Sequence, residues 1–96
     1  MTGYVISPEA QIDLQDIFDF TTEEWGEVQA EKYLYELYSV FERLVTFPMM
    51  GRARPKLAEE MRSFPIGAHI IFYLIWQNQI AVARVLHASR DVENFF

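Results

Sequence analysis

The chain contains no cysteine, few basic residues and no long apolar run. It has eight lysine and arginine residues and fourteen acidic residues, which give a net charge of −6. Without cysteine there is no disulfide framework, thiol nucleophile or thiolate metal site. The negative charge argues against a general nucleic-acid binder, because such proteins hold phosphates with basic side chains. No apolar stretch approaches the roughly eighteen residues of a membrane span, and no basic region followed by an apolar one opens the chain. We therefore expect a cytoplasmic protein with neither a standard secretion signal nor a membrane partner.

What the chain does have is apolar and aromatic residues in amounts that suit one core. Hydrophobic residues make up 51% of the chain and aromatic residues 16%, which predicts a single domain over residues 1–96. Charge is uneven, with ten acidic and two basic side chains in residues 1–50 but four acidic and six basic ones in residues 51–96. Two interpretations stay open: the helices have solvated acidic faces, or the basic half receives an acidic partner segment.

The first half of the sequence predicts a short strand and two helices. After a strand at residues 3–6, Ser7 and Pro8 are typical of a helix N-cap and first helical position. Residues at spacings of three and four, from Ala10 to Trp25, form the apolar stripe of a helix that begins at Pro8. A second stripe predicts a helix over residues 27–47, separated from the first by Gly26 and stopped by Pro48. The short connection predicts an antiparallel hairpin. Several carboxylates are assigned to solvated faces of the first helix: Asp13, Asp16, Asp19, Glu23 and Glu24.

The second half predicts a loop and then three strands. The loop covers residues 49–56, and a strand at residues 61–64 is ended by Pro65 and a turn. Residues 69–76 are apolar on both faces, as in a central strand, and Gln77-Asn78 is the expected hairpin turn into residues 79–87. In that last strand, strict alternation would put Ile80, Val82, Arg84 and Leu86 on one face. The element order is thus β-α-α-β-β-β.

One cluster of polar residues suggests binding: Arg62, Arg84, His87 and Arg90. Adjacent antiparallel strands would bring Arg62 and Arg84 onto one face, where guanidinium groups suit a phosphate or carboxylate. A structural interpretation stays open, in which Arg84 pairs with an acid inside the fold and His87 bonds to backbone. The two histidines lack metal-ligand spacing and the four glycines are scattered. We therefore expect no metal, cofactor or covalent catalysis.

Four segments in order resemble one bacterial family. They are SPEAQIDL at residues 7–14, WGEVQAEKYLYEL at 25–37, FERLVTFPMMGRARPKL at 41–57, and the closing RSFP at 62–65 with RVLHASRD at 84–91. Each segment alone is a weak pattern, but their order and spacing are similar to those of ParE toxins. These belong to the ParE/RelE superfamily of type II toxin–antitoxin systems.

The resemblance implies a fold and a partner. The fold is α+β, with an antiparallel helical hairpin packed on a small, mainly antiparallel sheet. The partner is an acidic antitoxin, ParD-like with a ribbon-helix-helix DNA-binding domain, whose tail wraps the groove between hairpin and sheet. The toxin then touches DNA only through this partner.

Within the superfamily, ParE toxins are associated with inhibition of DNA gyrase, whereas RelE toxins cut messenger RNA on the ribosome. Arg62 and Arg84 stand where the RelE branch also has arginines. The C-terminal Tyr of that branch is missing, since this chain ends Asn94-Phe95-Phe96, and a ribosome-binding nuclease should be strongly basic. These departures favour a non-enzymatic toxin that binds DNA gyrase and is neutralised by its antitoxin.

The residues expected to contact the target or the antitoxin are Arg52, Arg54, Arg62, Arg84, His87, Arg90, Phe95 and Phe96. Two alternatives remain open. One is a ribosome-dependent endoribonuclease that uses Arg62, Arg84, His87 and Arg90, with His87 as acid or base near neutral pH. The other is a toxin that has lost its activity.

Overall fold

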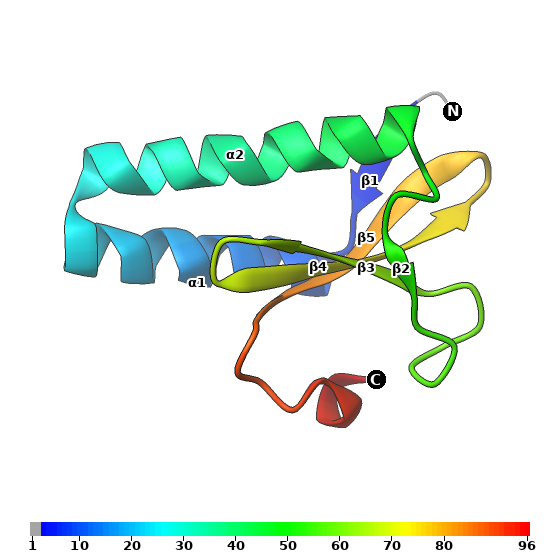
Figure 1. Cartoon of the computed structure of the whole chain (residues 1–96). Coiled ribbons are helices and arrows are strands. Elements are labelled where there is room, and N and C mark those ends of the chain that lie inside the picture. The colour runs from blue at the N-terminus through cyan, green and yellow to red at the C-terminus, as the bar shows by residue number, and fades with distance from the viewer. Residues whose placement is uncertain (1–2) are drawn as a thin grey trace.

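A helical hairpin covers one face of a five-stranded sheet, and the C-terminal segment crosses the other face (Figure 1). The computed structural model describes residues 3–96. Its elements, in chain order, are β1 (Tyr4–Ile6), α1 (Pro8–Trp25), α2 (Glu27–Thr46), β2 (Arg52–Ala53), β3 (Arg62–Ile66), β4 (His69–Trp76), β5 (Gln79–His87) and a 3-10 turn, η1 (Val92–Phe95). The sheet order is β1-β5-β4-β3-β2, with β1 parallel to β5 and every other pair antiparallel. This confirms the α+β fold class.

The helices begin and end where the local sequence requires. The Ser7 hydroxyl accepts a hydrogen bond from the Ala10 N–H at 3.0 Å, and Pro8 occupies the first turn. Gly26, at φ 90°, separates the two helices in a conformation that glycine adopts at little cost. Gly26 therefore allows the chain to reverse direction between α1 and α2 within one residue. Among the described residues, no helix is long and apolar enough to cross a membrane.

The strands β4 and β5 have the predicted bounds, and Gln77 and Asn78 both take positive φ in the turn between them. Two predictions were wrong. The 49–56 segment contains the short strand β2, which has no periodicity of its own and depends on pairing with Arg62 and Ser63. Strand β3 also continues through Pro65, because β2 covers only its first two residues and proline is tolerated at a free edge.

A β-bulge changes which residues of β5 face the helices. Tyr73 pairs with Val82 but Phe72 pairs with Arg84, so Ala83 is the extra residue on β5. Ile80, Val82 and Val85 consequently pack in the core under the hairpin, whereas Leu86 packs on the outer face. The predicted strict alternation along this strand was wrong, because a bulge shifts every later side chain to the other face.

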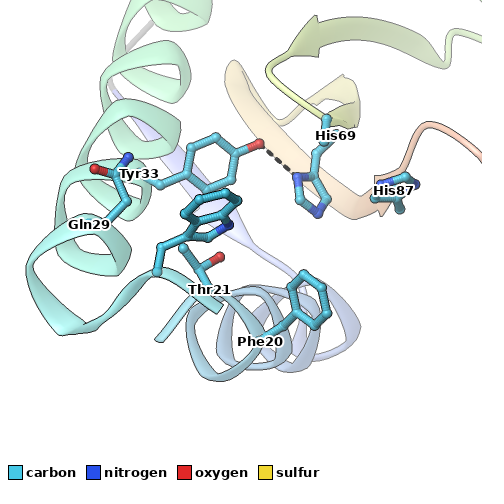
Figure 2. Close-up of a pocket in the computed structure, with 8 residues that line it drawn as sticks. Phe20, Thr21, Gln29, Tyr33, His69 and His87 are labelled. Carbon is cyan, nitrogen blue, oxygen red and sulfur yellow. Dashed lines mark hydrogen bonds between the residues drawn. The ribbon is translucent and has the colours of Figure 1, made fainter. Parts of the chain in front are cut away.

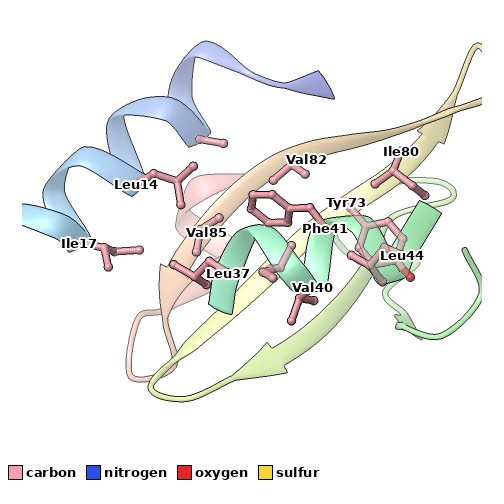
Figure 3. Close-up of a cluster of buried hydrophobic side chains, with 12 residues drawn as sticks. Leu14, Ile17, Leu37, Val40, Phe41, Leu44, Tyr73, Ile80, Val82 and Val85 are labelled. Carbon is pink, nitrogen blue, oxygen red and sulfur yellow. The ribbon is translucent and has the colours of Figure 1, made fainter. Parts of the chain in front are cut away.

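Two apolar cores result. The larger lies between hairpin and sheet, where Leu37, Phe41 and Leu44 of α2 meet Tyr73 and Ile80 (Figure 3). The smaller lies on the outer face, where Met61, Phe72 and Leu86 are covered by the 57–58 loop and by Val92 and Phe95. The sheet is thus buried on both faces at its centre.

Candidate functional site

The sheet order separates the two arginines that the sequence was expected to bring together. Arg62 lies on β3 and Arg84 on β5, with β4 between them. Arg62 donates hydrogen bonds to the carbonyl oxygens of Gly51 (2.9 Å) and Met49 (3.3 Å), which anchor the chain before β2. Arg62 pairs with Tyr73, whose side chain lies in the core under the hairpin, whereas Arg84 pairs with Phe72 of the outer-face core. The prediction of a joint Arg62–Arg84 face was therefore wrong, and Arg62 has a structural role.

Arg84 forms a bidentate ion pair with Asp13 of α1. Its Nε and Nη2 donate to the two carboxylate oxygens at 2.8 Å each, and the Val85 N–H donates to Oδ2 at 3.0 Å. The hydrogen bond to Asp13 raises the pKa of Arg84 above its ordinary value. Strand β1 pairs with β5 only as far as Val82, so the Val85 N–H has no partner on a neighbouring strand at that edge. Asp13 accepts this hydrogen bond instead. The structural interpretation of Arg84 is confirmed.

Asp13 itself was wrongly assigned to a solvated face, since it is only 9% exposed. It lies on the buried side of α1 with Ala10, Leu14 and Ile17. One signal was available: Asp13 follows Ala10 by three positions and precedes Ile17 by four, within the apolar stripe. A carboxylate in such a stripe needs a buried partner.

The remaining predicted residues, except His87, gather on the outer face of the sheet. The guanidinium carbons of Arg84 and Arg90 lie over the Phe95 ring, at 5.0 Å and 5.6 Å from its centroid. Phe96 packs on Phe72 with 5.3 Å between the ring centroids. Arg54 lies over the same Phe72 ring and donates to Ser63 Oγ. Arg52 is exposed on the edge strand β2, opposite Ser63. We call this group the outer-face surface: Arg52, Arg54, Arg84, Arg90, Phe95 and Phe96.

A second feature, which the sequence did not indicate as a site, is a hollow of about 580 Å³ between the closed end of the hairpin and the end of the sheet (Figure 2). We call it the tip pocket. Its helical wall consists of Phe20, Thr21, Trp25, Gln29 and Tyr33. Its sheet wall consists of Ala68, His69 and His87. The lining is mainly apolar and contains no lysine, arginine or carboxylate.

The two histidines meet at this pocket because they are cross-strand neighbours. Their rings are T-shaped, with centroids 5.5 Å apart, and His69 Nδ1 shares a 2.7 Å hydrogen bond with the Tyr33 hydroxyl. The Ser89 N–H donates to His87 Nδ1, so neutral His87 carries its proton on Nε2. Burial, and then the neighbouring His87, lower the pKa of His69. Across residues 3–96, no three His, Cys, Asp or Glu side chains gather as a metal site would require.

The lowered pKa of His69 predicts a specific acid sensitivity. The folded chain binds this proton less readily than the unfolded chain, so His69 reduces stability as pH falls below its ordinary pKa of about 6.5. We expect His69→Gln, which can still hydrogen-bond to Tyr33, to lose less stability than the wild type between neutral and mildly acidic pH. Urea unfolding of both proteins across this range tests the effect. Equal losses would show that His69 does not contribute.

Comparison with known proteins decides the family. The family model described as ParE toxin of type II toxin-antitoxin system, parDE, matches residues 4–92. The chain belongs to the ParE toxin family. The match spans the hairpin, the whole sheet and the start of η1, so it covers both the tip pocket and most of the outer-face surface.

Individual ParE relatives agree with this assignment. The chain is 40% identical over 91 residues to Toxin ParE1 of Mycobacterium tuberculosis, covering 94% of this chain and 93% of the relative. It is 34% identical to Toxin ParE1 of Caulobacter vibrioides, covering 95% of this chain and 94% of the relative. A solved structure of the chromosomal ParDE TA system from P. aeruginosa superposes with a TM-score of 0.78 at 18% identity, covering 91% of this chain and 96% of that one. That likeness supports the ParE-like fold.

Proposed function

We propose that this ParE-family toxin arrests bacterial growth by binding DNA gyrase in the cytoplasm, without catalysing a reaction, and that its cognate antitoxin neutralises it by binding. Membership of the ParE family carries the proposal. The similar chain from P. aeruginosa is part of a ParDE TA system, which supports a ParD-like antitoxin as the partner here.

The arrangement of the arginines supports a binding mode of action over RNA cleavage. Arg84 is occupied by Asp13, and Arg62 by two backbone carbonyls on the other side of β4. A nuclease of the RelE type would need these two guanidinium groups together on the scissile phosphate. The net charge of −6 also opposes approach to ribosomal RNA.

The outer-face surface is the proposed contact for gyrase. Arg90 and Phe96 are exposed there, and two guanidinium groups contact the Phe95 ring. Aromatic and arginine side chains supply much of the binding energy in protein interfaces, because they combine large apolar area with directional hydrogen bonds. The tip pocket, on the side of the hairpin, stays available to the antitoxin.

The deciding experiment is supercoiling of relaxed plasmid by bacterial DNA gyrase with purified toxin. We expect the toxin to inhibit supercoiling or to trap linear plasmid, and the antitoxin encoded beside the toxin to relieve this effect. The Arg90→Glu toxin should inhibit supercoiling roughly tenfold or more weakly than the wild type. Glu42→Lys, an exposed reversal on α2, is the matched control. Undisturbed supercoiling at excess toxin would contradict the gyrase proposal. Cleavage of messenger RNA, abolished by His87→Ala, would then become the activity to test.

A further inference from the structure

The closed end of the hairpin combines exposed apolar side chains with a strong net negative charge. Phe20 and Trp25 line the tip pocket yet are 62% and 73% exposed. Large aromatic side chains left this accessible beside a hollow mark a surface that another molecule covers. Residues 19–36, which we call the hairpin tip, also hold six acidic side chains and one basic one, or −5 of the total −6.

The carboxylates lie beside the pocket on both helices. Glu24 follows Phe20 by four positions and Thr21 by three, so it is their neighbour on the surface of α1. Glu36 follows Tyr33 by three positions on α2; burial raises the pKa of the Tyr33 hydroxyl, and the charge of Glu36 adds to that shift. Within residues 3–96 the one salt bridge is that of Asp13 and Arg84, so no arginine or lysine of the described chain forms a salt bridge with the carboxylates of the hairpin tip.

This combination restricts what can occupy the pocket. A nucleic acid or an acidic peptide would bring negative charge to the carboxylates, and a second copy of the chain would oppose two hairpin tips of −5 each. The C-terminal segment of the same chain lies on the opposite face of the sheet, where Phe96 packs on Phe72. A partner segment with one apolar side chain, flanked by lysine or arginine, is complementary to both the uncharged lining of the pocket and the carboxylates beside it.

We propose that the tip pocket receives an apolar side chain of the antitoxin, carried on a segment whose flanking residues are lysine or arginine. This rests on the proposed function, and it specifies the chemistry of the partner. The anchor takes the hollow between Phe20, Tyr33 and His69 (Figure 2), while its basic neighbours face Glu24 and Glu36. The antitoxin segment that occupies the tip pocket is therefore locally basic, even where the antitoxin as a whole is acidic.

Affinity of the full-length antitoxin for toxin variants tests this, with unfolding temperatures confirming that each variant folds. We expect the Glu24→Lys/Glu36→Lys toxin to bind roughly tenfold more weakly at low ionic strength, with a smaller difference at high ionic strength. The matched reversal away from the hairpin tip is Glu42→Lys/Glu59→Lys, which should change the Kd less than about twofold.

A second pair of variants tests the apolar anchor. Phe20→Ala removes a pocket wall, whereas Ile12→Ala removes an equally exposed side chain (62%) of the same helix that does not line the pocket. We expect a loss of roughly tenfold for Phe20→Ala alone. Unchanged or tighter binding by the hairpin-tip variants, or equal losses in the controls, would overturn the inference while leaving neutralisation by antitoxin intact. Failure of the wild-type toxin to bind the antitoxin would overturn both.

Discussion

Replacing Asp13 with alanine is expected to lower the free energy of unfolding by about 3 kcal/mol. The substitution leaves the Arg84 guanidinium without its bidentate partner and the Val85 N–H without an acceptor. Loss of one partner of a buried ion pair costs roughly 3–5 kcal/mol, and the lower end applies because the Arg84 side chain is 20% exposed. Urea unfolding of the purified toxin at neutral pH measures the difference.

A double variant separates the uncompensated charge from the loss of packing. Asp13→Ala/Arg84→Met removes both charges and keeps an apolar side chain near Phe95, so we expect it to be more stable than Asp13→Ala alone. The matched control is Asp16→Ala, an exposed carboxylate one turn along the same helix, which should change stability by less than about 0.5 kcal/mol. Equal destabilisation by Asp13→Ala and Asp16→Ala would show that the ion pair does not stabilise the fold.

The sequence predicted the elements of this fold better than the faces of its strands. The bounds of β4 and β5 follow from continuous apolar runs interrupted at Gln77-Asn78, and the helices follow from Ser7, Gly26 and Pro48. These are local signals. The bulge at Ala83 and the placement of β4 between Arg62 and Arg84 arise from pairing between distant segments, so no local pattern encodes them.

The candidate site shows the same division. Arginines in a mildly basic half of the sequence indicated a binding surface, and Arg54, Arg84 and Arg90 do gather with aromatic rings on the outer face. The tip pocket was missed, because it forms where α1, α2 and the start of β4 converge and each contributes ordinary residues. Trp25 was assigned to the apolar stripe of α1, yet the hairpin extends past the sheet there and leaves it 73% exposed.

Substitution of Gly51 by alanine is expected to destabilise the fold by about 1–3 kcal/mol, despite the small size of the added methyl group. A Cβ at this position would lie 2.5 Å from the Tyr73 hydroxyl oxygen and 2.9 Å from the Ser63 carbonyl oxygen. The hydroxyl cannot easily move, because it accepts a hydrogen bond from the Gly51 N–H at 2.8 Å and donates to the Pro48 carbonyl at 2.7 Å. Gly3→Ala, whose Cβ would meet nothing within 4 Å, is the matched control and should be close to neutral.

The stability losses caused by substitutions at Gly51 and Tyr73 should not be additive. Tyr73→Phe alone leaves the Gly51 N–H and the Pro48 carbonyl without their buried partner, at a cost of about 1–3 kcal/mol. The ring carbon Cε1, which would lie 2.6 Å from a Cβ at Gly51, remains in Tyr73→Phe. The same change nevertheless removes the hydroxyl oxygen and releases the ring from its two hydrogen bonds, so that the ring can shift away from the methyl group. The Gly51→Ala/Tyr73→Phe protein should therefore lose less stability than the two single losses added together. Thermal or urea unfolding of the four proteins in this cycle measures the coupling. Strict additivity would show that the backbone of β3, rather than Tyr73, resists the methyl group, and that Arg62, which donates to the Gly51 carbonyl, is the residue to vary next.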